Sequence, residues 1–310
     1  MRILCATDLL PGGEAAIERA GLLAQQLDAE LTILHVTSPK DSAETLGRNL
    51  KVADERARCR KEPAPARLRR PAVVTVPAGD PSRIILETLA QSNAKLLVLG
   101  PHRKSPLPVA LEGTIAANAL AARNCPVLVV RNQVRDAYRR VLLALDFSEG
   151  SLAAVRAAES LVLTPDVMAT VVHAHKPPVR GMLQLMDPRL DSIDQYGADW
   201  VREADHAVRE LLEYESANAA RYDIRIERQP AAPAILQAID RCAPDLVVMG
   251  TRGAGRLRRA LGGSIANRVL HGATCDVLIV PEGSFGASRS KMDFGAHRAR
   301  EATSAFRDLQ

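Results

Sequence analysis

The sequence predicts an α/β protein of two doubly wound domains, each a five-stranded parallel sheet with helices on both faces. Two observations predict this fold. The 310-residue chain repeats itself, and within each repeat short runs of Val, Leu and Ile alternate with Ala-rich helical segments. Continuous apolar strands that alternate with helices are typical of parallel sheets buried on both faces. Right-handed crossovers between such strands then give a doubly wound domain.

The repeat has two offsets. Residues 96–130 align with residues 246–280 at an offset of 150, and 14 of the 35 positions are identical. The N-terminal parts align at an offset of 138, which pairs Asp8 with Asp146 and His35 with His173. The difference of 12 residues predicts an insertion in the second copy between His173 and Gly250. A unit of this length is too long for a solenoid repeat, so we expect a duplicated domain.

The elements of each copy follow in the same order. A first strand ends before an Asp and leads into an Ala-rich helix, and a second strand, a variable segment and a third strand follow. A helix, a fourth strand that ends at Gly, a loop, a helix and a last strand complete the copy. The expected strands are 3–7, 31–36, 73–77, 96–99 and 127–130 in the first copy, and 141–145, 169–174, 224–227, 246–249 and 277–280 in the second. The expected helices are 15–27, 84–90 and one from near Thr114, then 152–162, 234–241 and one from near Ser264, with 200–214 helical in the insertion. The predicted domains are 1–135 and 138–283, followed by a polar tail at 284–310.

Composition excludes several classes of function. Aromatic residues make up only 3% of the chain, which argues against base-stacking platforms. The five cysteines are scattered without a C-x-x-C pair, which argues against a disulfide framework and a structural zinc site. Apolar runs are strand-sized, and Asp8 comes too early for a secretory segment. We therefore expect a cytoplasmic protein that does not bind membranes.

The positive charge of the chain is local. The net charge is +5, whereas residues 56–70 alone carry seven Arg or Lys and one Glu, or +6, which leaves the remainder at −1. The excess is therefore one patch, which we interpret as a solvated helix end and loop. We expect this segment to be a solvated patch and not a nucleic-acid site.

The loop after the strand at 246–249 has the spacing G-x2-G-x9-G-S. Glycines at Gly250 and Gly253 allow backbone N–H groups to approach an anion closely. Gly263 and Ser264 place free amides and a hydroxyl at a helix N-terminus, where the helix dipole favours phosphate. Each glycine alone is also compatible with a tight turn or a helix cap. The combination predicts a phosphate-binding loop, although no P-loop or dinucleotide fingerprint is present.

With this loop and the Asp after the first strand, the chain resembles a tandem universal stress protein, in which two universal stress protein A domains are fused. The resemblance covers residues 1–132 and 138–282. It implies ATP, with Mg²⁺ as an additional candidate, beside the carboxylate of the first strand and over the glycine loop. It also implies pairing of the last strands, so that 127–130 lies antiparallel to 277–280 in a pseudo-dimer. The implied nucleotide-binding residues are Asp146, Ala174, Gly250, Gly253, Gly263, Ser264 and Ile265.

The first copy departs from the pattern in its loop. Arg103 stands at the middle glycine, and Pro101, Pro106 and Pro108 each remove an amide donor. Arg103 and its neighbour Lys104 could instead supply charge in place of amides. The positions that remain are Asp8, Val36, Gly100, Gly113 and Thr114. We expect this first site to be degenerate and the chain to bind one nucleotide, in the second domain.

Other conspicuous residues have structural interpretations. His35 and His173 end the second strand of each copy and are expected to be core or rim histidines, not metal ligands. Cys125 and Cys275 precede the last strands and are expected to be buried. Ser148 and Ser151 fit helix N-cap chemistry better than a nucleophile, because no G-x-S-x-G surrounds them.

Three functions stay open on the sequence. The first is an ATP-binding stress-response regulator, and the second is a slow ATPase at the same site. The third is a scaffold or interaction protein without nucleotide. Asp146 is the one carboxylate that the sequence places at the site, which is little for hydrolysis. We assign no catalytic and no metal-binding residue, and we expect further self-association of the chain.

Overall fold

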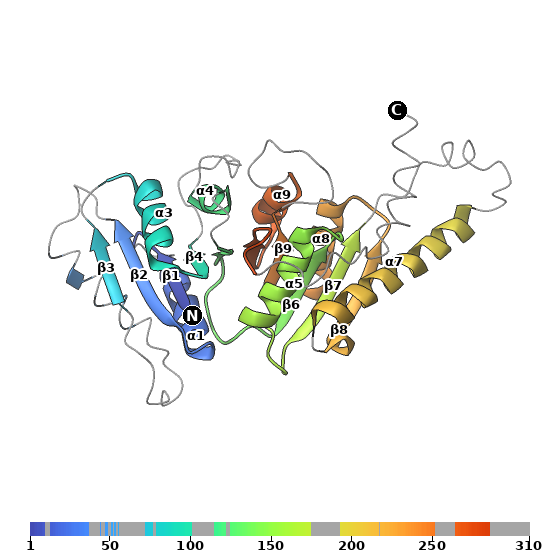
Figure 1. The fold of residues 1–310 in the computed structure, drawn as a ribbon, viewed down its shortest axis with the longest axis horizontal. Coiled ribbons are helices and arrows are strands. Elements are labelled where there is room, and N and C mark those ends of the chain that lie inside the picture. The colour runs from blue at the N-terminus through green and yellow to red at the C-terminus, as the bar shows by residue number, and fades with distance from the viewer. Residues whose placement is uncertain are drawn as a thin grey trace.

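A computed structural model describes residues 1–9, 13–36, 72–76, 79–100, 115–121, 125–174, 193–216, 218–251 and 264–285, with scattered positions between 44 and 55. The ten strands in these residues form one continuous sheet in the order β3-β2-β1-β4-β5-β10-β9-β6-β7-β8 (Figure 1). The strands are β1 (Arg2–Ala6), β2 (Glu30–Val36), β3 (Ala72–Val76), β4 (Leu96–Leu99), β5 (Val127–Val129), β6 (Arg140–Leu145), β7 (Met168–Ala174), β8 (Tyr222–Glu227), β9 (Leu246–Gly250) and β10 (Asp276–Val280).

Each half of the sheet is a parallel doubly wound unit. The order β3-β2-β1-β4-β5 in the first half matches β8-β7-β6-β9-β10 in the second, and all neighbours within a half are parallel. The predicted fold class is confirmed. All the expected strands are present. The inner strands are short apolar runs buried on both faces, whereas the edge strand β8 is mostly half-buried.

The helices cover both faces of the sheet. One apolar cluster joins α1, α5 and α7 to one face, and a second cluster joins α3, α4, α8 and α9 to the other. Both clusters run through the two halves, so the core is continuous across the boundary between the copies. The helices are α1 (Glu14–Gln26), α3 (Pro81–Ser92), α4 (Ile115–Ala121), α5 (Glu149–Leu161), α7 (Ile193–Glu215), α8 (Ala231–Cys242) and α9 (Ser264–Gly272), with a 3-10 turn η1 (Ala219–Arg221).

The halves join through β5 and β10, which pair antiparallel with Leu128 opposite Leu278. The expected pseudo-dimer is therefore confirmed. Antiparallel pairing reverses the strand direction, so the carboxyl ends of the first half lie at the same edge of the sheet as the amino ends of the second half. The linker 130–139 can be short because it joins the end of β5 to the start of β6 along that one edge. The carboxyl edges of the two halves face opposite ways.

The insertion of the second copy contributes the long helix α7, which contains the expected helix 200–214. Val208, Leu211 and Leu212 are buried in the cluster on the α5 face. Figure 1 shows α7 beside β8, at the outer end of the sheet. No helix in the described part of the chain is long and apolar enough to cross a membrane.

Candidate functional site

The predicted residues of the second site gather at the carboxyl edge of the second half. Asp146 directly follows β6, Ala174 ends β7 and Gly250 ends β9. Ser264 is the first residue of α9, and Ile265 follows it. The strands of Asp146, Ala174 and Gly250 are neighbours in register, and ligands of open α/β sheets bind at this edge. Gly253 and Gly263 lie outside the described residues.

Two of these residues share an apolar surface. Ala174 and Ile265 are half-buried and pack against the cluster on the α8 and α9 face, which also contains Met249 and Val172. Ala174 ends β7 and Ile265 lies in the first turn of α9, so this side of the sheet has partly exposed apolar residues at the strand ends, which we call the apolar floor. Such a floor, with a few polar groups around it, suits the flat base of a nucleoside.

The carboxylate of Asp146 is held by two serines. Its Oδ1 accepts hydrogen bonds from the Ser148 hydroxyl at 2.6 Å, the Ser151 hydroxyl at 2.7 Å and the Ser148 N–H at 3.2 Å. The Asp146 N–H donates to the Ser151 Oγ at 2.8 Å. Phe147 between them has a φ of 60°, in the left-handed region that folds the chain back sharply. We name these residues, Asp146, Ser148 and Ser151, the serine clasp.

Ser148 has a second role as the N-cap of α5. Its side chain accepts a hydrogen bond from the Ser151 N–H at 3.3 Å, which satisfies one free amide of the first turn. The expected capping by Ser148 is confirmed. The hydrogen bond from Ser151 to Asp146 was not predicted, although the spacing D-x-S-x-x-S could have indicated it.

Gly250 lies against the first turn of α5. A Cβ at this position would be 2.6 Å from the carbonyl carbon of Gly150 and 2.7 Å from its oxygen. The glycine therefore has a packing reason that is independent of any ligand. It lets the start of α5, and with it the serine clasp, approach the end of β9.

The two histidines tie neighbouring strands together. The Nδ1 of His173 lies 2.9 Å from the Leu145 carbonyl oxygen, and the Nδ1 of His35 lies 3.0 Å from that of Thr7. A carbonyl only accepts, so each Nδ1 carries the proton. Both histidines are 6% exposed, as expected of core histidines. No group of three side chains suited to a metal ion occurs in the described ranges.

An aromatic contact connects α7 to the strand ends. The His173 ring lies 4.5 Å from the Phe147 ring and 6.3 Å from the Trp200 ring, between centroids. Trp200 is the one tryptophan of the chain and lies in the insertion. No sequence pattern predicted its position near His173.

The first half keeps the turn of the site but not the clasp. Asp8 follows β1 and is exposed, and Leu9 has a φ of 57° that matches Phe147. The counterparts of Ser148 and Ser151 are Leu10 and Gly13, which carry no hydroxyl. Val36 ends β2 and Gly100 follows β4, whereas Gly113, Thr114 and the rest of the loop 101–114 lie outside the described residues.

Burial makes three of the cysteines unreactive, and two of them are those predicted to be buried. Desolvation raises the thiol pKa to about 12 in each of Cys5, Cys125 and Cys275. Because the thiolate is the nucleophile, these residues are core hydrophobes and do not contribute chemistry.

The described groups fit a nucleoside phosphate. The clasped Asp146 carboxylate can accept from ribose hydroxyls or bind a cation. Helix α9 begins at the same edge, where the positive end of a helix dipole favours phosphate. The apolar floor at Ala174 and Ile265 faces this edge as well.

The family model and the similar proteins agree on one family. The universal stress protein family model matches residues 1–131 and again 137–281. A universal stress protein of Mycolicibacterium smegmatis is 26% identical over 297 residues, which cover 90% of this chain and 96% of the relative. The stress response protein NhaX of Bacillus subtilis is 26% identical over 163 residues, covering 46% of this chain and 96% of the relative.

Two solved structures share the fold. A universal stress protein from Archaeoglobus fulgidus has a TM-score of 0.62 at 20% identity, covering 91% of this chain and 98% of its own. A Pseudomonas aeruginosa protein of unknown function has a TM-score of 0.59 at 22% identity, covering 98% of this chain and 97% of its own.

Proposed function

Because the chain belongs to the universal stress protein family, with two family domains in tandem, we propose that it is a stress-response regulator that binds one ATP per chain. The nucleotide binds at the carboxyl edge of the second domain. The domains extend over residues 1–135 and 138–283, followed by the tail 284–310. The protein acts in the cytoplasm and associates further with itself.

The observation that carries the proposal is the difference between the two aspartates. Asp146 is fixed by two hydroxyls and an N–H, whereas the repeat replaces both serines near Asp8 by Leu10 and Gly13. A preorganised carboxylate binds a ligand without first losing conformational entropy. In the first copy, Arg103 stands at the position of Gly253, which also favours binding in the second domain.

In the proposed complex, Asp146 would accept from the ribose or hold Mg²⁺. Ala174, Ile265 and Gly250 would contact the base. Gly253, Gly263 and Ser264 would bind the phosphates. Binding is regulatory in this proposal, since no residue is assigned to activate a water.

The first experiment identifies what the purified protein carries. The chain is denatured, and released small molecules are identified by chromatography and mass spectrometry. We expect one adenine nucleotide per chain. Protein that releases none, and whose calorimetric titration with ATP and Mg²⁺ shows no heat of binding, would reject the proposal in favour of a scaffold.

The second experiment locates the site by calorimetry with ATP. Gly253→Arg gives the second loop the residue of the first and should abolish binding. Gly263→Val should do the same by crowding the helix start. The matched control Gly113→Val changes the first copy and should leave the affinity unchanged. Two nucleotides per wild-type chain, or normal binding by Gly253→Arg, would contradict the assignment to the second domain.

A further inference from the structure

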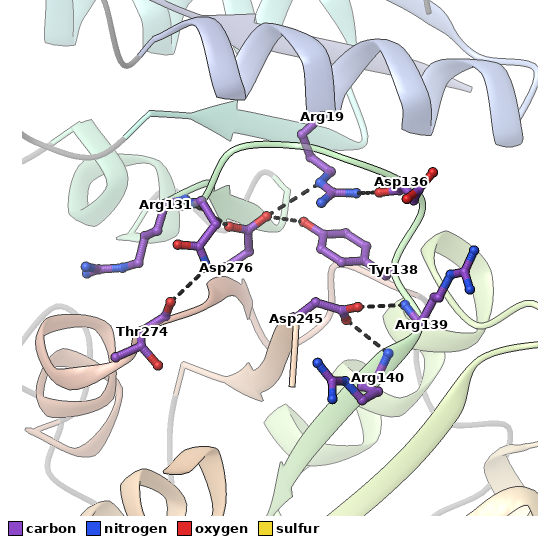
Figure 2. Close-up of polar contacts among 10 residues, drawn as sticks. Arg19, Arg131, Asp136, Tyr138, Arg139, Arg140, Asp245, Thr274 and Asp276 are labelled. Atoms are coloured by element: carbon purple, nitrogen blue, oxygen red, sulfur yellow. Dashed lines mark hydrogen bonds and ion pairs between the residues drawn. The ribbon is translucent and has the colours of Figure 1, made fainter. Parts of the chain in front are cut away.

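A buried polar cluster joins the two halves beside the β5–β10 pair. Asp276, the first residue of β10, is 1% exposed. Its Oδ1 accepts from the N–H groups of Arg131 at 2.8 Å and Asn132 at 3.3 Å. Its Oδ2 accepts from the Tyr138 hydroxyl at 2.7 Å and lies 3.5 Å from the Arg19 Nε. Figure 2 shows Arg19 of α1 and Tyr138 of the linker pointing toward this carboxylate.

Arg19 is itself buried, with 6% of its surface exposed. It donates to the Asp136 carbonyl at 2.8 Å, and its guanidinium carbon lies 3.8 Å above the centre of the Tyr138 ring. Burial is the main reason that the pKa of Tyr138 is raised, so the phenol stays protonated and donates to Asp276. The charge of Asp276 is thus compensated by groups from the first half and the linker.

The repeat does not reproduce this cluster. The counterpart of Asp276 in the first copy is Pro126, and the counterpart of Arg19 in the second copy is Ala157. Both counterparts are buried and uncharged. The Arg19–Asp276 ion pair therefore exists on one side of the pseudo-twofold axis only, although the strands β5 and β10 themselves are nearly alike.

The asymmetry determines which domains can pair. If two second domains paired through β10, Asp276 would meet Pro281 in place of Arg131, and a proline has no N–H to donate. Glu282 would replace Asn132 and bring a second carboxylate, and Ala157 would replace Arg19.

If two first domains paired through β5, Arg19 would face Pro126 and lose its carboxylate partner. Each like pair thus leaves a buried charge without its partner, and only the unlike pair compensates both charges. Removal of one partner from a buried ion pair is strongly destabilising. Each like pair should therefore form less readily than the unlike pair, by a factor of roughly 100 or more in the equilibrium constant.

We propose that the Arg19–Asp276 cluster is a pairing determinant. It makes the β10 surface of the second domain specific for a partner that carries an arginine at the position of Arg19 and free N–H groups after its last strand. The same surface rejects a second copy of itself. The first domain fits this surface, so the tandem chain closes on itself through β5 and β10 and does not form linear assemblies through them.

The test uses the folded full chain with a protease site inserted after Gln133, which is exposed in the linker. The chain is cut after folding, and native mass spectrometry distinguishes first–second, first–first and second–second pairs by mass. Isotope-labelled and unlabelled cut proteins are mixed and warmed until mixed-isotope pairs prove that the halves exchange. We expect only first–second pairs from the wild type. Like pairs in amounts comparable to unlike pairs would overturn the proposal.

The variant Arg19→Gln/Asp276→Asn removes both charges and should produce like pairs, with the preference reduced by roughly 100-fold or more. The matched control Arg209→Gln/Asp205→Asn neutralises an exposed ion pair of 2.7 Å on α7 and should behave as the wild type. Exclusive unlike pairing by the interface variant would also overturn the proposal. If this variant does not fold, like pairs from the wild type in amounts comparable to unlike pairs would still overturn the proposal.

Discussion

Gly250→Ala tests how closely α5 must approach the candidate site. The added Cβ would lie 2.6 Å, 2.7 Å and 2.9 Å from the carbonyl carbon, oxygen and Cα of Gly150. Ordinary contacts between carbon atoms are about 3.5–4.0 Å. The two backbones would therefore have to separate by roughly 1 Å, and no side chain is present that could turn aside.

The expected loss of stability is that of an overpacked core. Such substitutions cost about 1–3 kcal/mol. For a domain of this size, that loss lowers the unfolding temperature by roughly 2–12 °C. The separation also moves the first turn of α5, so the serine clasp shifts relative to Ala174 and nucleotide affinity should fall.

Two other glycines provide matched controls for the same substitution. At Gly47 an added Cβ meets no atom of the described residues within 4 Å. At Gly272 it meets the Leu236 Cδ2 at 2.8 Å, which is the end of a flexible side chain. Gly47→Ala and Gly272→Ala should unfold within about 2 °C of the wild type, since a methyl group can be accommodated at both sites.

The assay is thermal unfolding followed by circular dichroism, with calorimetric titration of ATP on each variant. If Gly250→Ala unfolds at the wild-type temperature, α5 and β9 have room to separate and the packing argument is wrong. A stable variant with weakened ATP binding would instead assign Gly250 to the approach of the ligand.

Three further predictions concern the clasp, the thiols and the basic segment. Asparagine can both cap α5 and donate to Asp146, so Ser148→Asn should keep ATP affinity in calorimetry, whereas Ser148→Asp should lower the unfolding temperature and the affinity, because its carboxylate cannot donate and repels Asp146. Equal ATP affinities of the two variants would argue against the clasp. In the folded protein the thiol pKa of Cys5, Cys125 and Cys275 is about 12, above the ordinary 9.0, so the unfolded chain loses these protons first. The stability contributed by their burial is complete below pH 9 and should decline between pH 9 and pH 12 in urea titrations. The decline should disappear when each cysteine is replaced by alanine, and a decline that persists would exclude the thiols as its cause. The segment 56–70 should give negligible DNA retention near physiological salt, and tight, salt-sensitive binding would show that the patch is a nucleic-acid site.

The strands were predictable because local composition determines them. A short apolar run such as Leu142 to Leu145 is typical of a strand buried on both faces in a covered parallel sheet. The repeat then doubled the evidence for each element. The pairing of β5 with β10 came from the family resemblance, since the two strands have no complementary pattern of their own.

The remaining features depend on contacts between distant residues. Gly250 and Gly150 are 100 residues apart, and only the packed structure shows that their backbones touch. Arg19 lies in an amphipathic helix, where an arginine is normally exposed. Asp276 at the start of an apolar strand has the pattern of an ordinary strand boundary. Arg19 and Asp276 become informative only when the two copies are paired.

Antiparallel pairing gives the two carboxyl edges different neighbours. The edge of the first half adjoins the amino ends of the second half, and there the N–H groups after β5 and the guanidinium of Arg19 are already used by Asp276. The edge of the second half faces the opposite way, and in the region that would correspond to this cluster its residues are Ala157 and Pro281. In the proposed arrangement, polar groups at the carboxyl edge of the first domain bind Asp276 of the second domain. At the carboxyl edge of the second domain, the serine clasp holds the Asp146 carboxylate in position for a ligand. On this proposal, the contribution of the first domain to the interface does not depend on its glycine loop, where Arg103 stands at the position of Gly253.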